Sequence, residues 1–195
     1  MIQKQGKGHN GGLAASLPRQ LNSVSTVDSV VTKAVKSCAK RMGFDNTKDL
    51  IARIKEGDPK AYEYYNYNIA KQLGEVLGSL DKKIRAVYAY DYDDATPEDV
   101  CFGNALPVSL IRIIIWAERK TKAVDALVAA IDRAMVQHYS HMLGLHDLEH
   151  VLDVQVIDDE DVRRRTGCGA LLQSVYQPPI QVWCSGIDIR RQRQV

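Results

Sequence analysis

Residues 111–135 read IRIIIWAERKTKAVDALVAAIDRAM, an uninterrupted apolar run followed at once by a helical pattern. In an extended chain, alternate side chains point to opposite faces, and here both faces are apolar. One face carries Leu110, Ile114 and Trp116, and the other carries Ile111, Ile113 and Ile115. A strand of this kind lies centrally in a sheet and is covered on both sides. The pattern therefore predicts a central β-strand over about residues 108–116, with Leu110, Ile114 and Trp116 covered either by N-terminal helices or by a second subunit.

The second half of the quoted stretch predicts an amphipathic helix from Lys120 to about Leu143. Its apolar positions recur at helical spacing along one stripe, which comprises Val124, Leu127, Val128, Ile131, Met135, His138 and Met142. The charged residues Lys122, Asp125, Asp132 and Arg133 lie largely off that stripe. We expect this helix to bury one side.

The remaining elements follow outward from this pair. Alternating segments predict strands over about 84–90 and 150–158, and a strand within 169–183 that is broken or ended by Pro178-Pro179. Upstream, Ser25 or Thr26, Asn46 and Asp58-Pro59 are typical starts of three helices, the first ending at Gly43 and the third at about Gly78.

Together these elements predict an α+β fold. We expect a mostly antiparallel sheet of four to five strands with one long helix packed on it, preceded by two or three N-terminal helices. The predicted organisation is a flexible N-terminal arm over 1–25, N-terminal helices over 26–60, an α+β core domain over 61–186 and a basic C-terminal tail over 187–195.

The charge balance limits the classes of partner. The chain has 26 basic and 24 acidic residues in 195, a net charge of +2, which provides no broad field to attract nucleic acid or an anionic membrane. Arg190, Arg191 and Arg193 could supply only weak, salt-sensitive contact with nucleic acid. The N-terminus lacks an apolar signal core and no membrane-spanning run occurs, so we expect a cytosol-like compartment.

Two clusters have the residue types of metal sites. The stretch QHYSHMLGLHDLEH brings together His138, His141, His146 and His150, with Asp147, Glu149 and Asp153 nearby. Such ligands suit zinc, although His138 also continues the apolar stripe and the other histidines suit a helix end. Asp91, Asp93, Asp94, Glu98 and Asp99 follow a predicted strand, where they form either a magnesium site or a solvated turn. A small metal-dependent enzyme using the His138–His150 cluster or the Asp91–Asp99 loop is thus the alternative function.

The cysteines suggest neither a zinc ribbon nor a disulfide framework. Cys38, Cys101, Cys168 and Cys184 form no CxxC pair, and we expect reduced, buried thiols. Within TGCGALL, Cys168 has no adjacent base, so a nucleophilic role would require a histidine brought in by the fold. The glycines of this stretch more simply permit a tight entry into a hairpin or close packing.

Two groups are candidates for contact with a partner. Tyrosines at 62, 64, 65 and 67 cover too much of one helix for a single core stripe, so we assign a contact to Tyr62 and Tyr65. A block of acids, Asp158, Asp159, Glu160 and Asp161, adjoins a block of bases, Arg163, Arg164 and Arg165. These blocks either pair between identical subunits or form solvated surface.

The order of these segments resembles the tail terminator family of tailed bacteriophages. The resemblance covers roughly residues 61–184 and runs through AYEYYNYNIAKQLGEVLG, IRAVYAYD, VSLIRIIIWAE, KTKAVDALVAAIDRAM, HVLDVQVID and GALLQSVYQPPIQVW. The segment GKGHNGG also resembles N-termini of phage and prophage proteins. The chain differs from the family pattern in its arm, its N-terminal helices and the long connection at 137–150.

The resemblance implies a structural virion protein at the tail or neck. Six copies would form a ring that caps the tail tube, stops its polymerisation and offers a surface to the head connector. The implied partners are other copies of the chain, the tail tube protein and the head connector or neck protein. The task would require neither catalysis nor a cofactor, and the protein would be assembled in the host cytoplasm.

Overall fold

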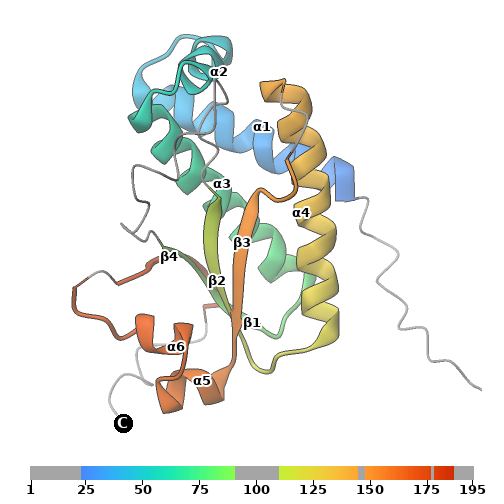
Figure 1. Ribbon diagram of the computed structural model, residues 1–195, viewed down its shortest axis with the longest axis vertical. Coiled ribbons are helices and arrows are strands. Elements are labelled where there is room, and N and C mark those ends of the chain that lie inside the picture. Colours follow the sequence, from blue (N-terminus) through green and yellow to red (C-terminus); the bar gives the residue numbers. More distant parts are fainter. Residues whose placement is uncertain (1–22, 91–109, 145–147, 177, 187–195) are drawn as a thin grey trace, which may run out of the picture.

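A computed structural model describes residues 23–90, 110–144, 148–176 and 178–186. Residues 23–25 of the predicted arm are helical, whereas its other residues, the acidic loop at 91–99 and the predicted tail at 187–195 lie outside the described residues. The described residues form a four-stranded sheet in the order β3-β2-β1-β4 with helices on both faces (Figure 1). This arrangement confirms the predicted α+β class.

The sheet is mixed but mostly antiparallel. It consists of β1 (Ile84–Ala89), β2 (Ile111–Ala117), β3 (Leu152–Ile157) and β4 (Ile180–Cys184). Strand β1 pairs antiparallel with β2 and β4, while β2 and β3 run parallel with Ile111 opposite Leu152. The parallel pair arises because α4 (Lys122–Leu143) carries the chain back across the sheet between β2 and β3.

The three predicted N-terminal helices are present as α1 (Ser23–Met42), α2 (Thr47–Lys55) and α3 (Pro59–Leu80). Asn46 caps α2 by accepting a hydrogen bond from the Asp49 amide, and Asp58 caps α3 by accepting from the amides of Lys60 and Ala61. These side-chain oxygens satisfy amides that have no partner within the helix. The predicted start signals of α2 and α3 are therefore confirmed.

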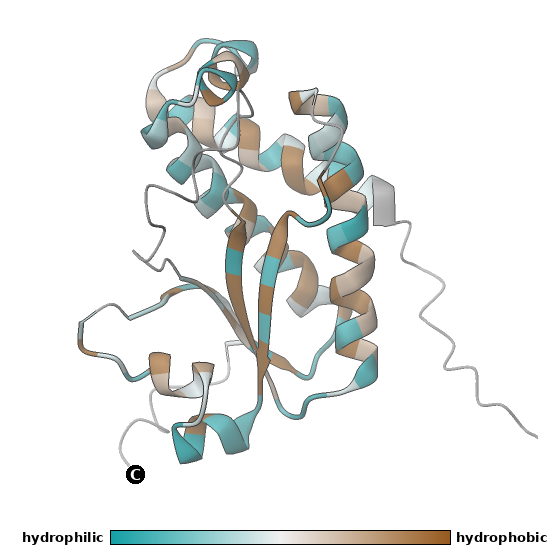
Figure 2. Ribbon diagram, viewed as in Figure 1, coloured by the Kyte–Doolittle hydropathy of each residue, from teal (hydrophilic) through white to brown (hydrophobic). Residues whose placement is uncertain are grey.

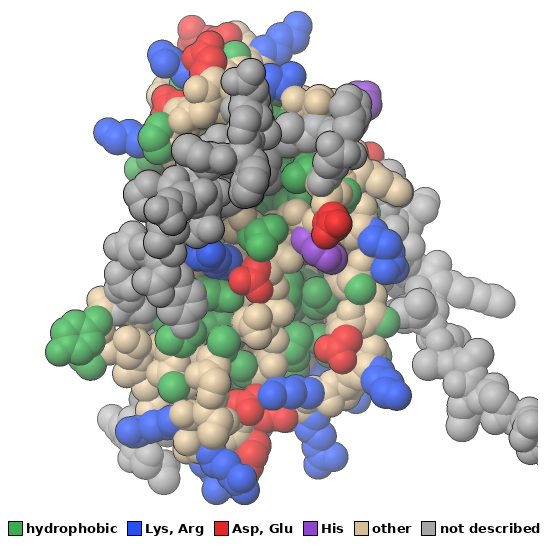
Figure 3. Space-filling view, viewed as in Figure 1, with side chains coloured by type: hydrophobic (Ala, Val, Ile, Leu, Met, Phe, Trp, Pro, Cys, Tyr) green, Lys and Arg blue, Asp and Glu red, His purple; other side chains and the backbone are tan. Residues whose placement is uncertain are grey.

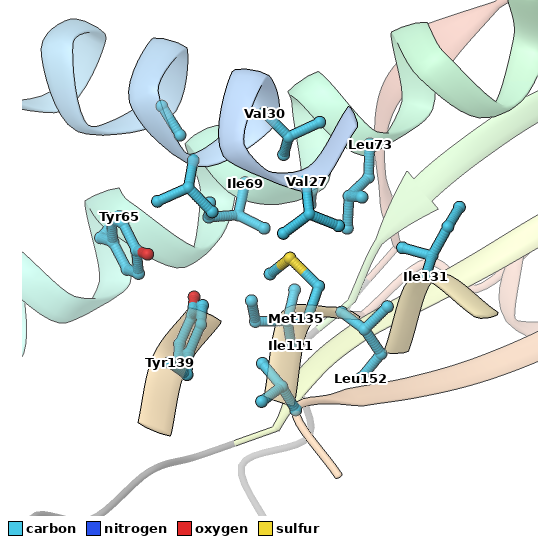
Figure 4. Close-up of a cluster of buried hydrophobic side chains, with 14 of the residues drawn as sticks. Val27, Val30, Tyr65, Ile69, Leu73, Ile111, Ile131, Met135, Tyr139 and Leu152 are labelled. Atoms are coloured by element: carbon cyan, nitrogen blue, oxygen red, sulfur yellow. The ribbon is translucent and has the colours of Figure 1, made fainter. Parts of the chain in front are cut away.

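Helices α1, α3 and α4 cover one face of the sheet and share its main core. Figure 4 shows Met135 of α4 among Val27 of α1, Ile69 of α3 and Ile111 of β2. Tyr65 of α3 and Tyr139 of α4 lie within the same core with ring centroids 5.8 Å apart. The hydrophobic face of α4 is therefore shared between the sheet and α1, as its amphipathic pattern predicts (Figure 2).

Strand β2 is buried on both faces, as its sequence predicts. Ile113 and Ile115 belong to the main core, whereas Ile114 and Trp116 lie on the opposite face with Ala86, Tyr88 and Ile157. This second face is covered by α5 (Asp159–Arg164) and α6 (Cys168–Leu171). Val162 of α5, Leu171 of α6 and the following Leu172 pack against it. Neither the N-terminal helices nor a second subunit is needed to cover Ile114 and Trp116, while Leu110 remains 40% exposed.

The prediction that a strand begins at Gly169 is wrong. Residues 159–164 and 168–171 are helical, and β4 begins only after Pro179. Asp158 starts α5 through a capping box with Asp161, which favours a helix over an irregular turn. Gly169 lies so close to the Asp161 carbonyl that a Cβ there would clash, which confirms the close packing expected of these glycines.

Candidate functional site

The clearest candidate for an interaction surface is the segment that leads into β4. Five large hydrophobic residues are exposed in the described part of the chain, and three of them lie here: Val175 at 89%, Tyr176 at 94% and Ile180 at 58% exposure. We call these three residues the β4 edge patch. Large apolar side chains exposed within a short stretch of chain are typical of surfaces that bind another protein.

Strand β4 is an edge of the sheet, which adds a second means of contact. It pairs with β1 on one side and has no strand on its other side among the described residues. The backbone groups along such an edge can pair with a strand from another chain. The preceding Pro178-Pro179 cannot donate backbone hydrogen bonds, so the paired part of the edge begins at Ile180.

The edge is held firmly on α3 by Trp183. A Cβ built on Gly74 would lie 2.8 Å from the Cβ of Trp183, and one built on Gly78 would clash with the indole ring. The two glycines, four residues apart on one helical face, thus form a seat for the indole. The hydrogen bond between the Ser185 amide and the Arg85 carbonyl, at 2.9 Å, secures the far end of β4.

The acidic residues of α5 are engaged within their own chain. Asp159 accepts hydrogen bonds from Nε1 of Trp116 at 2.9 Å and from Nη2 of Arg85 at 2.8 Å. Asp161 pairs with Nζ of Lys120 at 2.6 Å, and Asp158 caps the helix. Burial disfavours the charged form of Asp161, but the Lys120 ammonium and the backbone hydrogen bond to Asp158 hold its pKa below the ordinary value.

The basic block at the end of α5 is less constrained. Arg163 and Arg164 both pair with Glu160, and the hydrogen bond from Arg163 lowers the pKa of that carboxyl. Arg163 and Arg164 nevertheless keep exposed guanidinium groups, and Arg165 is an exposed residue in the left-handed conformation at the helix end. The acids that we expected to meet a neighbouring subunit thus have internal partners, while the arginines remain accessible.

The two tyrosines assigned to a partner contact differ in position. Tyr65 is fully buried against Tyr139, so it has no surface with which to contact a partner. Tyr62 is half-buried against the main core, and Tyr64, which was not assigned, is 41% exposed with Arg41 over its ring. Burial of Tyr65 follows from the fourth-residue spacing Tyr65, Ile69 and Leu73, which one stripe of α3 presents to the core.

The histidines are separated by the fold. His138 is half-buried rather than part of the closed core, with Nδ1 3.0 Å from Oδ1 of Asp28 on α1. His150 lies 2.7 Å from Oδ2 of Asp132, and His141 is exposed. His146 and Asp147 lie outside the described residues, as do the acids at 91–99. Among the residues that the structure describes, no three His, Cys, Asp or Glu side chains are placed to hold a metal ion.

Asp132 is a residue whose role the sequence did not reveal. It is 8% exposed, so its expected position off the buried side of α4 is wrong. Its Oδ1 accepts hydrogen bonds from the amides of Val151 at 3.0 Å and Leu152 at 2.9 Å, at the start of β3. Burial of this carboxylate is offset by these bonds and by His150. The available signal was the position of Asp132 directly beside Ile131 and four residues after Val128, at the margin of the apolar stripe.

The thiols differ from expectation. Of the three cysteines in the described ranges, Cys38 is buried, Cys168 is half-buried and Cys184 is exposed, and all three are free. Burial raises the pKa of Cys168, and the charges of Asp153 and Asp161 raise it further. A raised pKa disfavours the thiolate that nucleophilic catalysis needs.

The comparisons with known proteins find no relative. No protein-family model matches the chain, and neither a curated protein nor a solved structure matches it. In the part of the chain that the structure describes, none of the helices has the length and hydrophobicity to span a membrane. Geometry and the order of elements therefore provide the basis for a functional proposal.

Proposed function

We propose that this chain is a structural virion protein of a tailed bacteriophage, a tail terminator whose copies close into a ring. The ring would cap the tail tube, stop its growth and present a surface to the head connector. The protein acts by assembly rather than by catalysis, and it needs no cofactor. Its partners are copies of itself, forming a hexamer, together with the tube and the neck protein, and it is assembled in the host cytoplasm.

The observation that carries the proposal is the β4 edge patch. Val175, Tyr176 and Ile180 expose apolar surface beside a sheet edge that has no partner strand among the described residues. Apolar surface and a free edge favour association with another folded chain, and a head-to-tail contact of this kind closes into a ring when its rotation permits. The resemblance in the order of elements directs the proposal to the terminator family.

The mechanism is steric and depends on repetition. One patch of three exposed side chains gives a weak contact, but a closed ring makes the contact once per copy and all copies hold one another in place. The rigid seating of β4 on α3 through Trp183, Gly74 and Gly78 lets each copy present the edge in the same geometry. The ring then ends the tube because no further tube subunit can add beyond it.

The test is the mass of the full-length protein in solution, by light scattering after size exclusion, alone and with tube protein. We expect a ring of about six copies in one of these conditions, and we expect Val175→Ser/Tyr176→Ser to dissociate it without unfolding the protomer. Tyr64→Ser is the matched change on the exposed face of α3. Dissociation by Tyr64→Ser alone would place the contact on α3 instead of the β4 edge.

A chain that stays monomeric even with tube protein present would overturn the proposal. Elemental analysis of the same preparation addresses the metal-dependent alternative, since near-stoichiometric zinc, manganese or iron would favour it. His138 and His150 pair with Asp28 and Asp132, and no group of three potential ligands occurs among the described residues, so no specific contact favours that second function.

A further inference from the structure

The fold brings three charged segments, whose combined charge is positive, to one end of the sheet. They are residues 81–85, between α3 and β1, residues 118–122, between β2 and α4, and residues 158–165, around α5. These segments contain nine Lys and Arg against six Asp and Glu, although the whole chain has 26 against 24. We call this surface the basic end.

Hydrogen bonds and ion pairs join the three segments to one another. The Glu118 amide donates to the Lys83 carbonyl at 2.9 Å, which joins the first two segments. Lys120 pairs with Asp161 at 2.6 Å, and Arg85 pairs with Asp159 at 2.8 Å, which join both of them to α5. Figure 3 shows the resulting concentration of charged side chains at the lower end of the molecule, below the sheet.

The balance of free charge at this end is positive. Four of the six acids, Asp158, Asp159, Glu160 and Asp161, already have partners within the chain. The other two, Asp81 and Glu118, have no ion pair among the described residues, although Asp81 accepts a hydrogen bond from the Lys83 amide. By contrast, five bases are exposed and have no ion pair within the described part of the chain; they are Lys82, Lys83, Arg119, Lys122 and Arg165. Arg163 and Arg164 share a single acid, Glu160, so a further positive charge remains uncompensated there.

We infer that the basic end binds the phosphate backbone of a nucleic acid without reading its sequence. Arginine and lysine spread over several turns can contact successive phosphates, whose spacing along a backbone is regular. The Arg guanidinium groups present paired donors that fit phosphate oxygens. The surface consists of two loops and the six-residue helix α5, and none of its segments is an exposed helix long enough to read base edges in a groove.

An acidic protein is the competing occupant, and the distribution of apolar surface argues against it. Protein interfaces bury apolar and aromatic side chains at their centre, whereas nucleic-acid interfaces are more polar and more basic. The exposed large hydrophobic residues of the described chain are Tyr64, Leu110, Val175, Tyr176 and Ile180, and none of them belongs to the three segments. The basic end therefore offers charge without an apolar centre.

The chain also leaves the described residues at this end. Ser185 is hydrogen-bonded to the carbonyl of Arg85, and the described part ends at Gly186. The nine residues that follow, IDIRRQRQV, contain three arginines and one acid. The sequence that continues from the basic end thus has the same sign of charge.

The test measures binding of the full-length protein to a fluorescent duplex DNA of about 25 base pairs by anisotropy, at salt concentrations between 50 and 300 mM. We expect a dissociation constant on the order of 10 µM at the lowest salt, with log K falling linearly against log salt by about 0.9 for each phosphate contacted. Lys82→Glu/Lys83→Glu should weaken binding about 10-fold or more. It should also reduce the slope of log K against log salt by the contribution of about two phosphate contacts.

The matched control is Lys36→Glu/Lys40→Glu on α1, which makes the same change in net charge at exposed lysines in the upper part of the molecule (Figure 1). We expect this variant to bind within about 2-fold of the wild type, since charges farther away than the ~10 Å screening length contribute little. Equal losses in the two variants would overturn the inference, because binding would then follow net charge alone. Absence of binding at 50 mM salt, or equal affinity for poly-glutamate at the same charge density, would also overturn it, the latter in favour of an acidic protein.

Discussion

Asp132 on α4 holds His150, 18 residues further along the chain, through a 2.7 Å contact between Oδ2 and Nδ1. The other oxygen of the same carboxylate accepts hydrogen bonds from the amides of Val151 and Leu152. One buried acid on α4 thus connects the middle of this helix to the first residues of the edge strand β3. This relationship fixes where β3 begins.

The first prediction concerns the loss of that carboxylate. Asp132→Ala leaves two buried backbone amides without an acceptor, which we expect to lower the free energy of unfolding by roughly 2–4 kcal/mol. Urea denaturation measures this change. The neighbouring exposed Arg133→Ala should alter stability by less than about 0.5 kcal/mol. Similar effects of the two substitutions would show that the amides of β3 do not depend on Asp132.

The second prediction concerns pH. The hydrogen bond to Asp132, together with the charges of Asp132 and Glu149, raises the pKa of His150 above its ordinary value of 6.5. A folded-state pKa that exceeds the unfolded value stabilises the fold fully below pH 6.5, and this contribution is lost as the pH rises through the raised folded pKa. The stability difference between wild type and His150→Gln should therefore be largest in acid and shrink toward alkaline pH. In an Asp132→Asn background, the pH dependence of that difference should disappear, and its persistence would contradict the assignment.

The third prediction tests the seat of Trp183 on α3. An alanine at an exposed helical glycine normally stabilises a protein by up to about 1 kcal/mol. Gly78→Ala should do the opposite, lowering stability by about 1–3 kcal/mol, because its Cβ would overlap the indole of Trp183. Combining it with Trp183→Leu should cost less than the sum of the two single changes. Strict additivity in chemical denaturation would refute the contact.

The fourth prediction separates structural from surface acids on α5. Asp159→Ala removes the acceptor of the hydrogen bonds from Trp116 and Arg85. We expect the free energy of unfolding to fall by about 1–2 kcal/mol, which is less than for a fully buried pair because this carboxylate is partly exposed. The fluorescence of Trp116, recorded in a Trp183→Phe background, should change as its indole loses the hydrogen bond. Glu160→Ala, which removes only exposed pairs with Arg163 and Arg164, should leave both the stability and the emission nearly unchanged.

The sequence by itself determined the elements whose signals are local. The double-faced apolar pattern of residues 111–116 predicted a strand buried on both sides, and Ile113, Ile114 and Ile115 are all buried. The caps Asn46 and Asp58 predicted the starts of α2 and α3, because an N-cap acts on amides only two or three residues away. Apolar spacing in the same way predicted α4 and its one buried side.

Only the tertiary structure decided which distant residues meet. Burial of Asp132 depends on amides 19 and 20 residues later, and the covering of Trp116 depends on α5, whose Asp159 lies 43 residues further along the chain. Periodicity within a segment contains no information about such partners, because the same apolar face can be buried by any of several other elements of the chain. The basic end is equally non-local, because three segments that are distant in the sequence become one surface only when the sheet brings them together.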